Sequence, residues 1–291
     1  NNSGVELSAS YDVLKDQKFN LTVGGNFTRQ WSEVEELAEG QDIQVIGEAA
    51  DVVTAARMNQ PVGMIMGTAF ARNDEGKKII DDDNLPRIAT TEEGALDYEQ
   101  VIGNSFPKIL WGGNIRMSYN QLYFSLSVDS KMGHDIFSLT NQRGAEYGTL
   151  GFTTEGRDAW EKAKEISDVT GVPPQDGYMV HGVKNGQEGD YPVDPQKYWD
   201  RVARIHEAFV YDASYIRLKQ VNLTYRFDFS DNQQMPFTNL SVSVYGNNLF
   251  YIMRNTKNIS PRSSFGSNRT GIEMYAQPEL RNYGMKVQFT F

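Results

Sequence analysis

Apolar and polar residues alternate along several segments of the chain, most clearly along 19–28. Odd positions there carry Phe, Leu, Val, Gly and Phe, and even positions carry Asn, Thr, Gly, Asn and Thr. Successive side chains of a β-strand point to opposite faces, so this period of two predicts a strand with one apolar and one polar face. The segment 5–13 alternates in the same way, and the polar turn 14–17 joins the two into a predicted β-hairpin.

Five more segments repeat this pattern, which brings the number of predicted strands to seven. They are 111–119, 122–128, 213–228, 240–244 and 283–291. Within 213–228, Ile216 and Leu218 have the opposite parity from Val221 to Phe227. This strand is longer than a bilayer requires, so we expect either a β-bulge or an upper part that lies above a membrane.

The connections between the strands alternate in length. Short turns lie at 14–17, 120–121 and 229–238, and long connections lie at 32–108, 131–212 and 252–279. Outer-membrane barrels have short periplasmic turns at one rim and long extracellular loops at the other. The sequence therefore predicts an all-β fold, a transmembrane antiparallel β-barrel whose final strand ends on the periplasmic side.

Aromatic residues gather near the predicted short-turn rim, where an interfacial girdle is expected. They are Tyr11, Phe19, Tyr119, Tyr225, Phe227, Phe237, Phe289 and Phe291. The faces opposite the apolar ones carry mainly Gly, Ser, Asn and Thr, which suits a wet lumen. A soluble, extracellular glycan-binding β-sandwich is the alternative, and it requires the apolar faces to be buried against each other.

The long connections are predicted to contain structure of their own. Asp194-Pro195 begins an amphipathic helix that carries Trp199, Val202, Ile205 and Phe209. A weaker helix is expected over 155–167. Segments 66–72 and 77–80 flank the turn 73–76, which predicts a small hairpin above the membrane.

Composition excludes several classes of protein. The formal net charge is −10, whereas nucleic-acid binding requires clustered Lys and Arg. The chain has no cysteine, so disulfides and thiolate chemistry are excluded. It has no run of 18 apolar residues, and its first residues do not form a signal peptide. We therefore expect a chain that is either mature or lacks its beginning. Because seven strands are odd and bacterial barrels close with an even number, we also expect part of a larger barrel.

Specific strings resemble the C-terminal end of SusC/RagA-type TonB-dependent outer-membrane transporters. The strongest are DASYIRLKQVNLTYRF (212–227) and SVYGNNLF (243–250), followed by a final strand that ends in Phe291. Weaker matches, in the same order as in the family, are NNSGVELSASY (1–11), VGGNFT (23–28), QPVGMIMG (60–67), VIGNSFPK (101–108) and GHDIFSLTN (133–141). The residues of this motif are assigned a structural role, and they are Asp212, Ser214, Tyr215, Arg217, Leu218, Gly246 and Asn248.

This resemblance implies a 22-stranded barrel in the outer membrane of a Gram-negative bacterium. Residues 1–291 would be its last seven strands, with long, partly helical extracellular loops, and the plug and TonB box would lie outside the chain. A SusD-like lipoprotein would cover the extracellular mouth, and TonB would act on the plug. Phe289 and Phe291 resemble the signal that is read by the barrel-assembly machinery, although both side chains could simply face lipid.

Enzymatic and metal chemistry have little support in the sequence. His134, His181 and His206 show no metal-binding spacing, so we expect surface residues with no catalytic role. Asp81-Asp82-Asp83-Asn84 offers oxygen ligands for calcium, but it lacks the Gly and Glu of an EF-hand loop, and a solvated acidic turn is the preferred interpretation. No cofactor is predicted.

Five aromatic residues of the second long connection are the candidate contacts with substrate or lid protein. They are Trp160, Tyr178, Tyr191, Tyr198 and Trp199. Trp199 could instead pin its own helix to the barrel rim.

Two functions remain open. The first is TonB-dependent import of large nutrients, oligosaccharide or peptide, and the second is a structural subunit of a larger outer-membrane assembly. The sequence does not decide the substrate.

Overall fold

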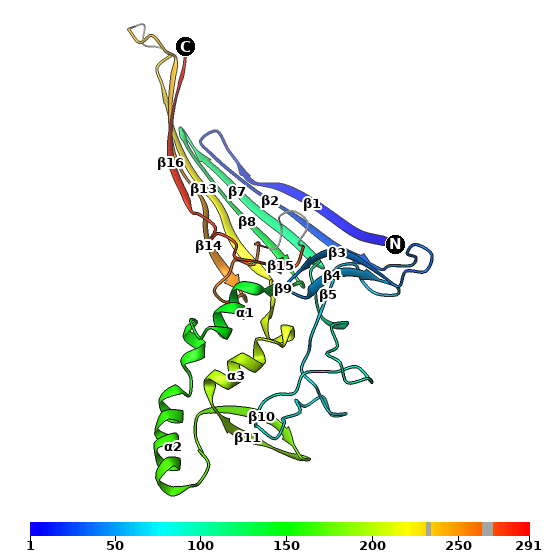
Figure 1. Ribbon diagram of the computed structural model, residues 1–291. Helices are drawn as coiled ribbons and strands as arrows, with labels where there is room; N and C mark the ends of the chain where they lie inside the picture. The colour runs from blue at the N-terminus through cyan, green and yellow to red at the C-terminus, as the bar shows by residue number, and fades with distance from the viewer. Residues whose placement is uncertain (231–233, 264–269) are drawn as a thin grey trace.

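A computed structural model describes residues 1–230, 234–263 and 270–291, and its main element is one antiparallel seven-stranded sheet (Figure 1). In their order across the sheet, the strands are β1 (Asn2–Lys15), β2 (Phe19–Ser32), β7 (Ile109–Tyr119), β8 (Leu122–Met132), β13 (Tyr215–Asp228), β14 (Asn239–Arg254) and β16 (Asn282–Thr290). All seven predicted strands are thus present, and each pairs with its neighbour in chain order.

The strand register confirms that the sheet has two different faces. One row of paired residues is apolar on every strand and consists of Leu14, Leu21, Met117, Phe124, Leu223, Val244 and Met285. Another row, on the opposite face, is polar or small on every strand and consists of Ser10, Gly24, Asn114, Ser127, Gln220, Asn247 and Asn282. Pairing strands fixes the parity of each side chain, so the alternation read from the sequence becomes a continuous property of the surface.

The apolar face of the sheet is exposed. Leu7, Tyr11 and Met285 have exposed fractions of 62%, 72% and 69%. The buried hydrophobic clusters of the described residues contain no side chain from these seven strands. In the part of the chain that the structure describes, no second layer packs on the apolar face, contrary to what a β-sandwich requires.

Strand β13 contains the bulge that its change of parity indicates. Its register with both neighbours shifts between Leu218 and Gln220, which leaves Lys219 as an extra residue. An extra residue reverses the side-chain alternation beyond it. This explains why Leu218 can pair with the apolar-face residue Val128.

The three long connections all extend from the same end of the sheet, and the short turns and the C-terminus lie at the other end (Figure 1). The predicted sorting of loops is therefore confirmed, although residues 231–233 of the third turn lie outside the described residues. We call segments 33–108, 133–214 and 255–281 the loop region, of which 264–269 are not described.

The loop region is built from short strands and helices. Its strands are β3 (Ile43–Ala49), β4 (Val52–Arg57), β5 (Met64–Gly67), β6 (Gln100–Asn104), β9 (Asp135–Ser138), β10 (Tyr178–Lys184), β11 (Gln187–Val193), β12 (Val210–Asp212) and β15 (Ile272–Glu273). Its helices are α1 (Leu139–Glu146), α2 (Arg157–Thr170) and α3 (Pro195–Val202), with 3₁₀ turns η1 (Gly151–Thr154) and η2 (His206–Phe209). Among the described residues, no helix has the length and apolarity needed to cross a membrane.

Two loop predictions need correction. The predicted hairpin is only partly present, because Met64–Gly67 pairs with β4 and β6, while the turn itself closes through the Arg72–Lys78 bridge. Helix α3 begins as predicted, with Asp194 as N-cap and Pro195 in its first turn, but it ends at Val202. Phe209 lies in the separate turn η2, so the apolar stripe spans two elements.

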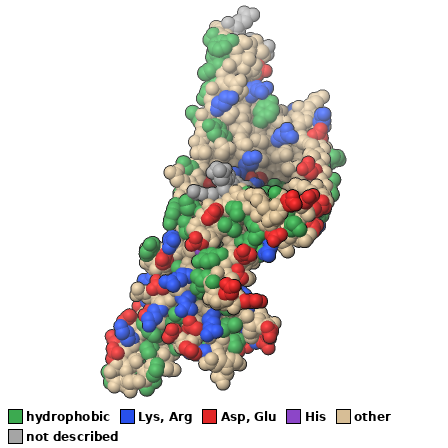
Figure 2. Space-filling model, turned by 45° about the vertical axis from the view of Figure 1, so that its right-hand side comes forward, with side chains coloured by type: hydrophobic (Ala, Val, Ile, Leu, Met, Phe, Trp, Pro, Cys, Tyr) green, Lys and Arg blue, Asp and Glu red, His purple; other side chains and the backbone are tan. Residues whose placement is uncertain are grey.

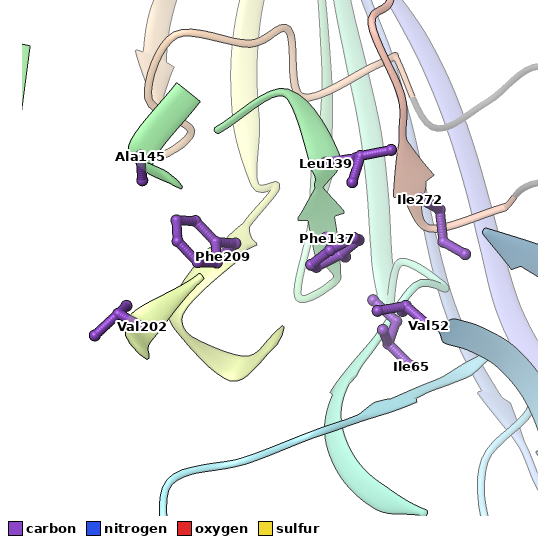
Figure 3. Close-up of a cluster of buried hydrophobic side chains, with 8 residues drawn as sticks. All are labelled: Val52, Ile65, Phe137, Leu139, Ala145, Val202, Phe209 and Ile272. Atoms are coloured by element: carbon purple, nitrogen blue, oxygen red, sulfur yellow. The ribbon is translucent and has the colours of Figure 1, made fainter. Parts of the chain in front are cut away.

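One hydrophobic core joins all three long connections (Figure 3). The first connection supplies Val52 and Ile65, the third supplies Ile272, and the second supplies Phe137, Leu139, Ala145, Val202 and Phe209. All eight side chains are buried. Segments far apart in the chain therefore fold as one body at the end of the sheet opposite the short turns, and its surface in Figure 2 carries most of the charged side chains visible in that view.

Candidate functional site

A buried ion pair joins three strands of the sheet at the end next to the loop region, and it contains the first group of motif residues. The Arg217 side chain is nearly fully buried. Its Nε and Nη2 donate to Oδ1 and Oδ2 of Asp129 at 2.8 and 2.7 Å. Its Nη1 donates to Oδ1 of Asn248 at 2.7 Å. A planar guanidinium that contacts three oxygens holds β8, β13 and β14 together at the end of the sheet where the loops begin.

Asn248 reaches Arg217 because β14 is irregular at this point. The register changes from the Gln220–Asn247 pair to the Leu218–Phe250 pair, which leaves Asn248 and Leu249 as extra residues. The φ of Asn248 is 54°, in the left-handed region that Asn tolerates better than most residues. Gly246 provides the space, because a Cβ there would lie 2.7 Å from a Leu249 methyl carbon.

The remaining motif residues fasten the loops to the top of β13. The Asp212 carboxylate accepts hydrogen bonds from the Ser214 N–H at 2.8 Å and the Asn255 amide at 2.7 Å. The Ser214 hydroxyl accepts from the Gly133 N–H at 3.0 Å. The Tyr215 ring is buried and packs edge-on against Tyr251, with ring centroids 5.6 Å apart. This geometry fits the structural role that the sequence assigns to the motif.

The five predicted contact aromatics come together at the far end of the loop region. Tyr198 stacks on Tyr178 with ring centroids 4.1 Å apart, and Trp199 meets the same two rings at 4.9 and 5.8 Å. Tyr191 packs on the same cluster as Tyr178 and Tyr198. Burial raises the pKa of the Tyr198 phenol, so it is neutral at every physiological pH.

Trp160 and Trp199 also line a cavity of about 490 Å³. It lies where the C-terminal end of α1 meets the N-terminal ends of α2 and α3, and its polar lining includes Arg157, Glu161 and Asp194. The sequence interpretation missed these three residues. The spacing of Arg157, Trp160 and Glu161 (i, i+3, i+4) could have revealed that they share one face of the predicted helix.

Trp199 packs its helix against other elements of the loop region, and not against the barrel rim. Its ring packs on Phe152 of η1 at 5.1 Å and on Tyr178 of β10. Its Nε1 has no hydrogen-bond acceptor among the described residues. The helix is therefore fastened to its neighbours by ring contacts alone at this position.

The acidic turn at Asp81 is an internal connection of the loop region. Asp81 Oδ1 accepts from the N–H groups of Asp83 and Leu85 at 3.0 and 2.9 Å, and its Oδ2 accepts from Arg201 of α3 at 2.8 Å. Lys184 donates to the Asp82 carbonyl oxygen at 2.8 Å. The turn is therefore not simply solvated, as the sequence interpretation expected. Within the described residues, no group of three or more His, Asp or Glu side chains is arranged to hold a metal ion.

The prediction that all three histidines lie at the surface is wrong for two of them. His134 and His206 are buried, and burial lowers the pKa of each to about 4. His206 Nδ1 accepts from the Thr68 N–H at 3.1 Å, which requires a neutral ring. His181 is exposed, and its contact with Asp190 at 2.9 Å raises its pKa. The burial of these two rings depends on contacts between distant segments, such as that between His206 and Thr68, which a single sequence gives no means to foresee.

The two residues of the predicted assembly signal lie at the short-turn end. Phe289 pairs with Leu240, and its ring meets Phe237 edge-on at 5.1 Å. Phe291 follows the last strand and has an exposed fraction of 85%. Tyr225 and Phe227 of β13 and Phe229 just after it continue this row of rings, with centroids 4.7 and 6.4 Å apart, so a row of contacting aromatics lies at this end.

Comparison with known proteins gives the same picture as the motifs. No family model matches the chain. It is 25% identical to TonB-dependent receptor P26 of Formosa agariphila over 218 residues, which cover 72% of this chain and 19% of the receptor. It is 20% identical to TonB-dependent receptor P3 of the same organism, with 100% of this chain and 28% of the receptor covered.

The solved structures that the chain resembles include the RagAB peptide transporter, with a TM-score of 0.63 and 18% identity. The RagAB peptide importer in its closed-closed state gives a TM-score of 0.64 and 17% identity. Both matches cover 100% of this chain and 29% of the solved chain. The resemblance to SusC/RagA-type TonB-dependent transporters is confirmed. The chain spans between 19% and 29% of the length of these proteins.

Proposed function

We propose that this chain forms part of the wall and the extracellular loops of a TonB-dependent importer in the outer membrane of a Gram-negative bacterium. The observation that carries the proposal is the seven-stranded sheet, whose exposed apolar face and polar opposite face suit lipid and a wet lumen. An open edge in lipid leaves backbone groups unpaired, so β1 and β16 would pair with strands supplied by the rest of a 22-stranded barrel.

The proposed cargo is a large nutrient, either an oligosaccharide or a peptide. A SusD-like lipoprotein would cover the loop region, and TonB would act on a plug carried by the rest of the protein. The aromatic cluster around Tyr178, Tyr198 and Trp199 would contact cargo or lid. Phe289 and Phe291 would be read by the barrel-assembly machinery. The relatives are described as receptors and a transporter, which fits a protein that is not an enzyme.

The decisive experiment uses the complete polypeptide that contains this chain, expressed in its outer membrane. Uptake of labelled oligosaccharides and peptides is measured with and without a functional TonB, and proteins that co-purify in mild detergent are identified. TonB-dependent uptake together with one SusD-like lipoprotein in equal amount is the expected result. A large set of unrelated partners and no TonB-dependent uptake would show instead a structural subunit of an outer-membrane assembly.

A further inference from the structure

A second cavity, of about 420 Å³, lies where β13 and β14 meet the third long connection, and we call it the arginine cavity. Arg217 and Tyr251 are in its lining. Tyr251 pairs with Arg217, and Arg217 pairs with Asp129. Asp129 pairs in turn with Gly112, which lies opposite Asn26 of the polar face. Because paired residues share a face, the arginine cavity lies on the polar side of the sheet, at the end next to the loop region.

The two carboxylates in the lining of the arginine cavity are already committed to other groups. Glu279 Oε1 forms an ion pair with Arg262 at 2.9 Å, and its Oε2 accepts from the Tyr251 hydroxyl at 2.7 Å. Glu273 has an exposed fraction of 1%, and its two oxygens accept three hydrogen bonds. A cation in the cavity would therefore find one carboxylate that is paired with a guanidinium and another that is buried.

Two of the three arginines in the lining are not committed. Arg217 is held by Asp129, but Arg254 and Arg281 are exposed and have no hydrogen-bond or ion-pair partner among the described residues. The Arg254 Cζ atom lies 5.9 Å from the centroid of the Tyr251 ring, a contact that leaves the guanidinium N–H groups free to donate. The uncommitted charges of the cavity are therefore both positive.

Free guanidinium groups beside a cavity favour one kind of ligand group. A guanidinium donates two parallel hydrogen bonds to the oxygens of a carboxylate or phosphate, and these bonds are stronger than those between neutral groups. A cationic ligand would be repelled by two like charges, and a neutral ligand would leave both charges without a counter-charge. Gln277, also in the lining, adds an amide that has no partner among the described residues. The lining therefore suits an anion that carries several oxygens.

We propose that the arginine cavity binds an oxyanion, a carboxylate, sulfate or phosphate group, with Arg254 and Arg281 as its donors. In an importer, the group would belong to a molecule on the polar side of the sheet, and this role in uptake rests on the proposed function. Binding of the anion follows from the cavity alone and can be measured whether or not the protein transports.

The test measures binding of inorganic phosphate to the complete protein in an uncharged detergent, from the broadening of the phosphate signal in ³¹P NMR. The ionic strength is kept low, because salt screens exposed charges. We expect a dissociation constant of about 1 to 10 mM. Arg254→Gln and Arg281→Gln should each weaken binding by about threefold, and the double variant by about tenfold, as expected for partly exposed ion pairs. Arg281→Lys keeps the charge and should retain most of the affinity.

Arg116→Gln is the matched control, because it removes the same charge from the polar face, opposite Ser125, and outside the cavity. Its affinity for phosphate should equal that of the original protein. Arg254 and Arg281 bond to no described residue, so their Gln variants should fold. The proposal is overturned if phosphate does not bind, if the double variant binds it equally well, or if Arg116→Gln weakens binding as much.

Competition with short oligomers identifies the source of the anion. Hexamers of galacturonic acid and of glutamic acid are compared with neutral hexamers of galactose and of glutamine. Displacement of phosphate by an acidic hexamer at lower concentration than by free phosphate itself would show that a larger molecule presents the group, and equal concentrations would assign the site to a free anion. Equal displacement by the neutral hexamers would overturn the proposal. TonB-dependent uptake without anion binding would also overturn it, whereas anion binding without such uptake would overturn the importer alone.

Discussion

The sheet and the loop region place their large apolar residues in opposite ways. On the sheet, Leu223 and Met285 have exposed fractions of 45% and 69%. In the loop region, Phe137 and Ile65 are completely buried in a core shared by three connections. One chain therefore contains a part suited to lipid and a part suited to water. The two parts differ in whether their large apolar side chains are exposed, as on the sheet, or buried, as in the loop region.

The end of the sheet next to the loop region is sensitive to substitution. We expect Arg217→Met to destabilise the packing of β8, β13 and β14 at this end by about 3 to 5 kcal/mol, because Asp129 would be left as an unpaired, partly buried charge. Trypsin should then cleave the loop region faster while the strands stay protected. Lys219→Met is the control, since Lys219 is the exposed extra residue of the bulge. Equal cleavage rates in the two variants would show that the ion pair does not stabilise this end of the sheet.

A charge placed on one face or the other of a single strand tests which face of the sheet contacts lipid. Leu223→Arg puts a guanidinium on the apolar face, which costs about 2 to 4 kcal/mol near the middle of a bilayer. Asn222→Arg, one residue earlier, faces the polar side and should cost little. Urea unfolding of the complete protein from lipid vesicles measures both. A larger loss for Asn222→Arg would mean that the polar face contacts lipid.

The sheet was predictable from the sequence, and most of the loop region was not. Strands such as β2 alternate over many residues, and the alternation alone fixes their faces. Strands β3 to β6 are four to seven residues long, and β5 is buried on every residue, so it has no alternation to detect. Their existence depends on contacts between distant segments.

The candidate site shows the same division. The aromatic residues near the cavity could be identified as candidate contacts from the sequence, and the N-cap of α3 could be predicted from Asp194-Pro195. The cavity itself could not, because Glu161 and Asp194 belong to different elements that meet only in the folded structure. The bond between Arg217 and Asn248 requires two irregularities on adjacent strands, and only one of them changes the hydrophobic pattern.

Acid should weaken the loop region and leave the sheet intact. The folded pKa of His206 is about 4 and the usual value is 6.5, so the unfolded state binds a proton more readily. The stability is complete above pH 6.5 and is lost as the pH falls toward 4, by up to about 3 kcal/mol for this one group. His134 acts in the same direction and window.

Hydrogen exchange of the loop amides between pH 7 and pH 4.5, corrected for the intrinsic rate, measures this loss. His206→Asn keeps an acceptor near the position of Nδ1 and cannot titrate, so it should flatten part of the pH dependence. His181→Gln should not flatten the loss, because the contact with Asp190 raises the pKa of this exposed side chain and therefore favours the folded state at low pH. If the hydrogen exchange of the loop amides depends on pH in the same way in His206→Asn, protonation of His206 is not the cause of the acid destabilisation.

The smallest effect is expected at the cap of α3, and it separates local helix stability from the rest of the molecule. Asp194→Ala removes the acceptor of the Gln196 N–H and should cost about 1 kcal/mol, whereas Asp194→Asn should cost only a fraction of that because Asn is an equally good N-cap. Hydrogen exchange at the first turn of α3 should reveal the difference, with β13 and β14 unaffected. Because Tyr198 and Trp199 lie on this helix, the alanine variant should also loosen the aromatic cluster. Equal exchange in both variants would mean that ring packing alone holds the helix.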